Sequence, residues 1–102
     1  MAQLLVLYNQ PADAAAFDRY YFETHIPIAK KIAGVRSLTV NSGKPATVVG
    51  SLSPHLIAEI EFDSMEALQA AMASPEGQAT AADLANFAHA GVTLLVFDTR
   101  TL

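Results

Sequence analysis

Side chains that can exchange protons are concentrated in residues 20–27 of the chain. This span holds Tyr20, Tyr21, Thr24, His25 and Pro27, and so contains two of the three tyrosines and one of the three histidines. An imidazole can accept or release a proton near neutral pH. A phenol can donate a hydrogen bond to a developing oxyanion. Together these groups are sufficient to remove a proton next to a carbonyl group.

An amphipathic helix is expected to position this cluster. Its apolar side, bordered by Tyr20 and His25, carries Phe17, Tyr21, Thr24, Ile28 and Ile32. Pro27 has no amide hydrogen and its ring crowds the carbonyl four residues earlier, so we expect a kink near His25. The alternative is that Tyr20, Tyr21 and His25 only form hydrogen bonds at the edge of an apolar core.

The remaining pattern predicts four strands and further helices around this segment. Apolar runs and alternation predict strands over residues 3–8, 35–41, 55–62 and 92–97, and a helix over residues 13–32. Asp63 and Glu66 resemble a capping box that opens a second helix. Ser74 and Pro75 fit the cap and the first residue at which helical structure restarts, and a short third helix is predicted over residues 79–87. Residues 42–54 have no periodicity and predict a long hairpin turn or a lid over the site.

This order of elements is β-α-β-β-α-β. It predicts an α+β, ferredoxin-like fold in which helices cover one face of a four-stranded antiparallel sheet. The 102 residues correspond to one domain, residues 1–102.

Composition excludes several classes of protein and site. The chain has no cysteine, which removes disulfides, thiolate metal sites and cysteine nucleophiles. Its net charge is −4 and its six basic residues are scattered, so we expect no nucleic-acid partner. No apolar run approaches the roughly 20 residues of a membrane span, and the first residues lack a basic leader. We therefore expect no membrane partner and a cytoplasmic location.

The apolar content predicts a homodimer that forms through the sheet faces. Hydrophobic residues make up 52% of the chain and charged residues 16%. Residues 4–7 and 94–97 are apolar at consecutive positions, so both faces of these strands require burial, whereas the helices cover only one. A second copy of the sheet is the simplest cover, since a two-fold contact needs only a self-complementary patch.

The chain resembles the EthD family over nearly its whole length. The residues that carry the resemblance are Tyr8–Pro11 with Asp13 and Phe17, the run from Tyr20 to Ala29, Gly34–Arg36, and Phe87–Thr93. The resemblance implies a dimeric α/β-barrel domain and an association with a gene cluster for breakdown of a fuel ether, beside an oxygenase. The wider superfamily includes cofactor-free monooxygenases and isomerases, so the fold alone selects no reaction.

In this fold the pocket is expected between the helices and the sheet, where it would hold a small apolar molecule. We expect His25, Tyr20 and Tyr21 to be catalytic, with His25 as general base or orienting donor and a tyrosine polarising a carbonyl or phenol oxygen. Tyr8, Thr24 and Phe62 are expected to bind the substrate.

The reaction class stays open at this point. If the protein is an enzyme, a cofactor-independent monooxygenase or an isomerase fits these residues. The histidines fall on separate elements, so we expect no metal site, and haem would need a larger cavity, so we expect no cofactor. The alternative function is a non-catalytic accessory or carrier protein that sequesters a hydrophobic intermediate for an oxygenase. A purely structural dimer with a filled core is the third possibility.

Overall fold

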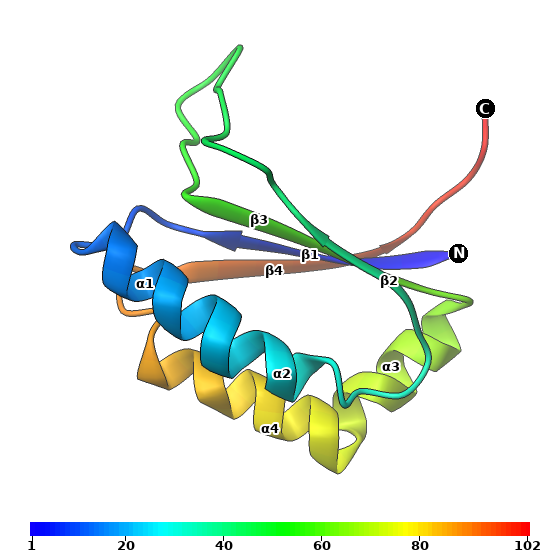
Figure 1. The fold of residues 1–102 in the computed structure, drawn as a ribbon. Helices are drawn as coiled ribbons and strands as arrows, with labels where there is room; N and C mark the ends of the chain where they lie inside the picture. Colours follow the sequence, from blue (N-terminus) through cyan, green and yellow to red (C-terminus); the bar gives the residue numbers. More distant parts are fainter.

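The computed structural model describes residues 1–102, and it has the predicted order of strands and helices. Figure 1 shows a single sheet with all of the helices on one side of it. The strands are β1 (Ala2–Tyr8), β2 (Val35–Val40), β3 (Leu56–Phe62) and β4 (Val92–Asp98). They lie in the order β2-β3-β1-β4 and every neighbouring pair is antiparallel. The α+β, ferredoxin-like prediction is therefore confirmed.

The first helical segment is continuous from residue 14 to residue 29, but it contains one wide turn. It consists of α1 (Ala14–Tyr20), the π-helix η1 (Tyr21–His25) and α2 (Ile26–Ala29). Asp13 caps its start, because the Asp13 carboxylate accepts a hydrogen bond from the amide of Ala16 at 3.0 Å. The amide of Ile26 donates to the carbonyl of Tyr21, five residues earlier. Pro27 cannot donate, so the predicted defect near His25 takes the form of this π-turn.

The π-turn changes which side chains face the sheet. Phe17, Tyr21, His25 and Ala29 are buried at a constant spacing of four residues. A regular helix would instead bring Thr24 towards the core, as the 3.6-residue period predicts. The widened turn rotates the later residues, so that Thr24 is exposed and His25 is only 4% exposed. The predicted core-facing position of Thr24 is wrong for this reason.

Two shorter helices, α3 (Met65–Ala73) and α4 (Pro75–Asp83), complete the helical layer, and a 3-10 turn (Leu84–Asn86) follows α4. Ser74 caps α4 with Pro75 in its first turn, as predicted. The predicted cap of α3 is wrong, since the side chain of Ser64 accepts from the amide of Ala67 while Asp63 pairs with Arg36. The short third helix predicted over residues 79–87 is not separate from this restart, since α4 runs from Pro75 to Asp83 and the 3-10 turn follows it. The start of α4 at Pro75 lies directly after α3, and this junction requires Gly77, because a Cβ there would collide with the Ala71 carbonyl.

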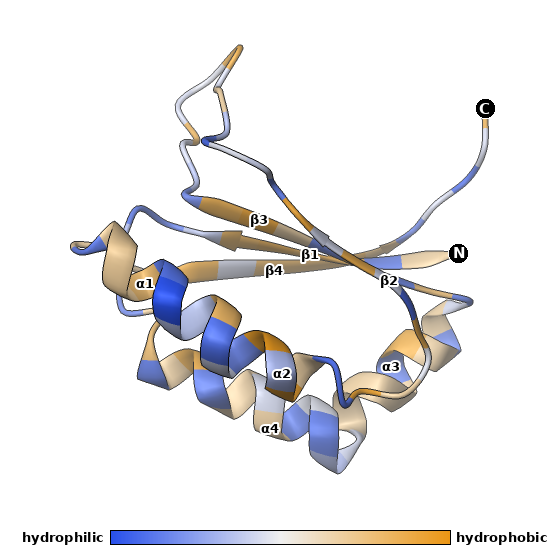
Figure 2. Ribbon diagram, viewed as in Figure 1, coloured by the Kyte–Doolittle hydropathy of each residue, from blue (hydrophilic) through white to orange (hydrophobic).

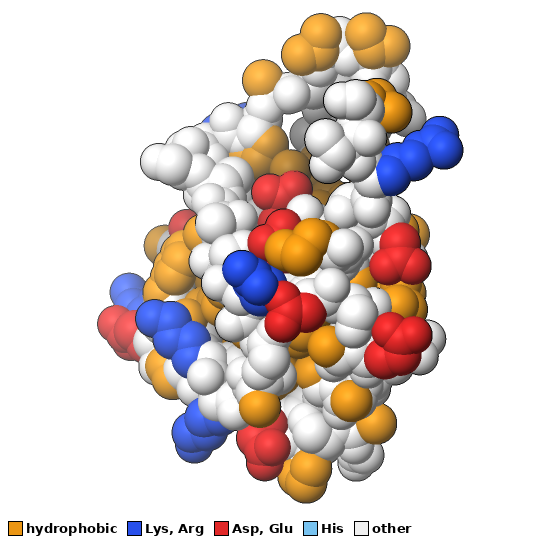
Figure 3. All heavy atoms as spheres, turned by 90° about the vertical axis from the view of Figure 1, so that its right-hand side faces the viewer, with side chains coloured by type: hydrophobic (Ala, Val, Ile, Leu, Met, Phe, Trp, Pro, Cys, Tyr) orange, Lys and Arg blue, Asp and Glu red, His pale blue; other side chains and the backbone are white.

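Residues 41–55, which connect β2 to β3, project away from the helices (Figure 1). Their tip exposes Val48 and Val49, each more than nine-tenths accessible, and hydrophobic side chains are visible there at the top of Figure 3. No residue of this loop lines the cavity described below. The expectation of a lid over the site is therefore wrong, and the hairpin alternative agrees with the structure.

The two faces of the sheet differ in how well they are covered. The helix-facing side chains of β1 and β3 are buried and form most of the core, and Figure 2 shows hydrophobic colouring along β1, β3 and β4. The alternate residues Glu59 and Glu61 of β3 point to the opposite face, as expected. Four consecutive hydrophobic side chains of β4, Leu94 to Phe97, are 39–47% exposed. The helices therefore leave this edge strand uncovered on both faces.

Candidate functional site

A cavity of about 90 Å³ lies between the helices and the sheet. Sixteen of its nineteen lining residues are hydrophobic, and none carries a formal charge at neutral pH when His25 is neutral. Its lining comes from every strand and from both helical segments. Met72 and Leu94 are the most exposed large side chains in the lining, at 42% and 39%. The cavity therefore approaches solvent at the edge of the sheet next to β4.

Three polar groups in the lining have no hydrogen-bond partner in the protein. They are the hydroxyls of Tyr8 and Tyr21 and the Nε2 atom of His25, whose residues are each less than 5% exposed. No buried side-chain nitrogen or oxygen of the structure is both inaccessible and unpaired. These three atoms therefore retain contact with open space, and the space beside them is the cavity. They are available to a ligand.

A buried carboxylate holds the other nitrogen of the imidazole. The Nδ1 atom of His25 lies 2.9 Å from Oδ2 of Asp83, and both side chains are 5–6% exposed. The Oδ1 atom of the same carboxylate accepts hydrogen bonds from the hydroxyl of Tyr20 at 2.7 Å and from Nδ2 of Asn86 at 2.9 Å. Asp83 thus has three donors around two oxygen atoms, which satisfies a buried charge.

The charges of the site follow from these contacts. Burial by itself would raise the pKa of the Asp83 carboxyl, but the hydrogen bonds from Tyr20, Asn86 and His25, with the charge of a protonated His25, together lower this pKa below its ordinary value. Asp83 is therefore ionised at neutral pH. Because an ionised carboxylate can only accept, the proton of a neutral His25 lies on Nδ1 and the Nε2 lone pair faces the cavity.

Burial raises the pKa of the two cavity phenols, Tyr8 and Tyr21, well above the ordinary value, with the neighbouring Tyr21 adding to the effect on Tyr8. Both phenols therefore stay protonated at any physiological pH and can donate hydrogen bonds to a ligand. The Tyr20 phenol has a raised pKa for a different reason, namely its hydrogen bond to the Asp83 carboxylate.

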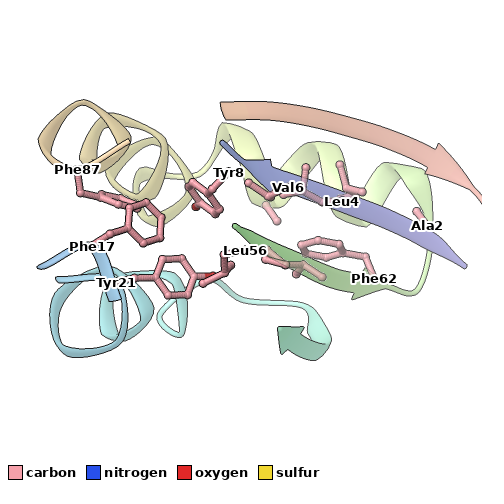
Figure 4. Packing of buried hydrophobic residues seen from close by; sticks show 13 residues of the cluster. Ala2, Leu4, Val6, Tyr8, Phe17, Tyr21, Leu56, Phe62 and Phe87 are labelled. Atoms are coloured by element: carbon pink, nitrogen blue, oxygen red, sulfur yellow. The ribbon is translucent and has the colours of Figure 1, made fainter. Parts of the chain in front are cut away.

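Aromatic packing restricts the orientation of the His25 ring. The ring centroid lies 4.7 Å from that of Phe87 and 5.5 Å from that of Tyr21. Figure 4 shows Tyr8, Phe17, Tyr21 and Phe87 gathered at one end of the core, whereas Phe62 lies towards the other end. The imidazole thus lies against rigid rings rather than flexible aliphatic chains.

The structure brings together four of the six predicted site residues. Tyr8, Tyr21, His25 and Phe62 line the cavity. Thr24 is exposed and does not line it, for the helical reason given above. The ring of Tyr20 lines a separate surface groove, bordered by Pro11, Asp13, Asn86 and His89, and its hydroxyl reaches Asp83 instead of the cavity.

Sequence reasoning missed Asp83 and Asn86. The only signal in the sequence is that Asp83 is the one Asp, Glu, Lys or Arg residue between Glu76 and Asp98, in a segment otherwise rich in alanine. A lone carboxylate in such a segment is often only a solvated charge. Its role depends on contact with His25, which lies 58 residues earlier in the chain.

The structure contains no group of three or more His, Asp or Glu side chains arranged to hold a metal ion. His89 is exposed, with its Nε2 atom 3.1 Å from the Ala85 carbonyl, and His55 pairs with Asp18 and packs against the ring of Phe17. None of the helices combines the length and the apolar character that a membrane span requires.

Two similar proteins match this chain over nearly its whole length. An uncharacterised 11.0 kDa protein of the thcB-thcC intergenic region of Rhodococcus erythropolis is 41% identical over 103 residues, which cover all of this chain and 98% of that protein. The crystal structure of an ethyl tert-butyl ether (EthD) family protein from Bacillus halodurans is 37% identical, with a TM-score of 0.87, and the match covers 98% of this chain and 99% of that one.

A third match shares the fold at low identity. SnoaB of Streptomyces nogalater, described as a cofactor-independent oxygenase, is 14% identical with a TM-score of 0.68, over 99% of this chain and 94% of that one. The model of the EthD domain matches residues 9–91. With this match over most of its length, and with relatives 41% and 37% identical to it, the chain belongs to the EthD family.

Proposed function

We propose that the protein binds a small, uncharged carbonyl or phenolic compound in the cavity and that His25 removes a proton from it. One observation carries this proposal. The Nε2 atom of His25 is unpaired and faces an apolar cavity, while Nδ1 is bound to a buried carboxylate. An imidazole used only for packing would gain nothing from a free nitrogen directed into a cavity.

The Asp83 carboxylate prepares His25 to act as a base. It keeps the proton of neutral His25 on Nδ1, and it stabilises the imidazolium that forms when Nε2 accepts a second proton. The proton moves from a C–H or O–H bond of the ligand to Nε2, and the electron pair of that bond remains on the ligand as an enolate or phenolate. Asp83 stays ionised throughout.

The phenols of Tyr8 and Tyr21 support the negative oxygen that this step creates. Both are permanent donors, and both line the same cavity as His25. Hydrogen bonds to a developing oxyanion in an apolar site are worth more than in water, and removal of one such donor typically costs about 10²–10³-fold in rate. This arrangement favours a ligand whose oxygen atom lies next to an acidic hydrogen.

The size and polarity of the cavity limit the ligand. Its volume of about 90 Å³ is smaller than the roughly 150 Å³ of an apolar cavity that accepts benzene. We therefore expect a single ring at most, with outward movement of Met72 and Leu94 at the exposed edge on binding. No lysine or arginine lines the cavity, so it offers no permanent positive charge to a ligand that is already anionic.

Two fates of the ligand anion fit this site. Return of the proton from Nε2 to a different carbon atom is an isomerisation. Addition of dioxygen, which must be supplied as co-substrate, to a carbon atom of the anion forms a C–O bond and, with the proton from Nε2, a hydroperoxide. Cleavage of its O–O bond with loss of one water molecule leaves a new carbonyl group, which is a cofactor-independent oxygenation. The description of SnoaB as a cofactor-independent oxygenase supports the second fate only through the shared fold.

A carrier function without turnover is the second candidate, and the almost entirely apolar lining favours it. Such a protein would retain a hydrophobic intermediate for a partner oxygenase, in keeping with the association that the family resemblance implies. A role in ether degradation and a cytoplasmic location remain predictions, and so does the absence of a cofactor.

A direct test compares the wild-type protein with His25→Gln and His89→Gln. Each protein is incubated with single-ring phenols, quinones and lactones, in D₂O and separately under ¹⁸O₂, and analysed by native mass spectrometry. Deuterium or ¹⁸O in released product that depends on His25 and not on the exposed His89 supports an enzyme. Stoichiometric retention without exchange, equal in all three proteins, would support the carrier and contradict the proton-transfer step.

The uncovered sheet face supports a homodimer as part of this proposal. Leu95 and Phe97 of β4 point away from the helices and are 47% and 40% exposed. Each face can cover the other in a two-fold contact. We expect sedimentation of a dimer at micromolar concentration, and a monomer for Leu95→Glu. Ala73→Glu on the exposed surface of α3 is the matched control and should remain a dimer.

A further inference from the structure

We propose that Tyr20 and Asn86 are positioning residues that set the tautomer of His25 through Asp83. Tyr20 then acts from outside the cavity, although its neighbour Tyr21 acts inside it. The proposal deepens the proposed function because it concerns the same imidazole. Its central measurement, however, is made on the ligand-free protein.

Both positioning donors bind the same oxygen of Asp83. The Tyr20 hydroxyl and the Asn86 amide bind Oδ1 at 2.7 and 2.9 Å, which leaves Oδ2 for the Nδ1 atom of His25. A carboxylate held only by His25 could rotate about its terminal bond and present either oxygen. Two donors on one oxygen fix its plane, in the way that outer hydrogen bonds orient the ligands of a metal.

The donors come from two elements that meet only in the folded chain. Tyr20 ends α1, directly before the π-turn, and Asn86 lies in the 3-10 turn after α4. Tyr20 also stacks on Phe87, with ring centroids 5.3 Å apart, and Phe87 contacts the ring of His25. The network therefore holds the imidazole through the hydrogen bond to Asp83 and through packing against the tilted ring of Phe87.

Adjacent tyrosines thus have separable roles, which provides matched variants. Tyr20→Phe removes the hydroxyl bound to Asp83 but keeps the ring stacked on Phe87. Tyr21→Phe removes a hydroxyl of the cavity lining that makes no hydrogen bond to Asp83. Each change deletes one oxygen atom from neighbouring positions of the same helical segment.

The test is ¹⁵N NMR of histidine-labelled, ligand-free protein, under conditions in which the imidazoles are neutral. The wild-type spectrum should show His25 protonated on Nδ1, and Tyr21→Phe should leave it unchanged. Tyr20→Phe and the double variant Tyr20→Phe/Asn86→Ala should show increasing amounts of the Nε2-protonated form, with signals of His55 and His89 unmoved. Where ligand turnover is measurable, Tyr20→Phe should lower it by about 10–100-fold without a matching change in ligand affinity.

Two results would overturn the inference. One is a wild-type His25 protonated on Nε2, and the other is an unchanged His25 tautomer in Tyr20→Phe and in the double variant. If the double variant does not fold, as judged by circular dichroism, the Tyr20→Phe spectrum alone decides. A tautomer shift without any turnover in the wild type would leave this inference standing and remove the proposed enzyme function, so the two failures are distinguishable.

Discussion

The chain contains two His–Asp pairs of nearly equal length in very different surroundings. His25 lies 2.9 Å from Asp83, with side chains 5% and 6% exposed. His55 lies 2.8 Å from Asp18, with side chains 19% and 47% exposed. Distance alone therefore does not separate a candidate catalytic pair from a structural one.

The second pair has an anchoring role in the fold. His55 ends the projecting loop, its backbone amide donates to the Tyr8 carbonyl at 2.8 Å, and its ring makes a T-shaped contact with the ring of Phe17. The contact with Asp18 ties the start of β3 to α1. A partly exposed pair of this kind contributes about 0–1 kcal/mol. The difference between the pairs shows which features mark a candidate catalytic pair. They are burial, additional hydrogen-bond donors to the carboxylate, and an unpaired imidazole nitrogen beside a cavity.

Among the variants that test this comparison, we expect Asp83→Asn to have the largest effect. An amide at this position can donate to Nδ1, which forces the proton of neutral His25 onto Nε2 and removes the base from the cavity. We expect proton transfer to the identified ligand to fall by about 10³-fold or more, measured as deuterium exchange. Asp18→Asn is the matched control and should exchange at the wild-type rate. Equal losses in both variants would remove the distinction between the pairs.

The next effect concerns the cavity beside the buried pair. Tyr21→Phe should weaken binding of a phenol or ketone by about tenfold, because one hydrogen bond to the ligand oxygen is lost. Binding of a hydrocarbon of the same shape should not change. Calorimetric titration with both ligands checks this expectation, and an equal loss for the hydrocarbon would indicate altered packing instead.

The melting temperature in acid should show whether the buried Asp83 carboxylate stabilises the fold. The folded-state pKa of Asp83 is lowered, so its ionised form contributes stability that is fully present above the unfolded pKa and is lost as the pH falls through the folded pKa. Between pH ~4 and pH ~2, the melting temperature of the wild type should therefore fall more steeply than that of Asp83→Asn. Parallel curves would show that the carboxylate gives the fold no such contribution.

The smallest effect is expected at the His55–Asp18 pair. His55→Gln should change the free energy of unfolding by less than about 1 kcal/mol and should leave ligand exchange unaltered. Faster proteolysis of the loop at residues 42–54 would fit the loss of an anchor. A large loss of exchange in this variant would contradict the assignment of the pair as structural.

Local patterns in the sequence were sufficient for the strands, for the caps at Asp13 and Ser74, and for the helical segment that carries the cluster. Strand alternation and capping depend on residues a few positions apart, so they are visible without the fold. The same local reasoning failed at Thr24, because a single π-turn changed the helical phase. It also failed at Asp63, because Arg36 of β2, which is distant in the sequence, binds that carboxylate.

The sequence by itself therefore determined the α+β fold, the family resemblance and the presence of an imidazole among tyrosines. Only the tertiary structure decided that His25 lines the cavity and that Asp83 completes the site. It also decided that Tyr21 lines the cavity while Tyr20 binds Asp83 from outside it. The physical reason is that a buried carboxylate is stable only where its donors converge. These donors come from residues 20, 25 and 86, and they meet because α4 packs beside α2.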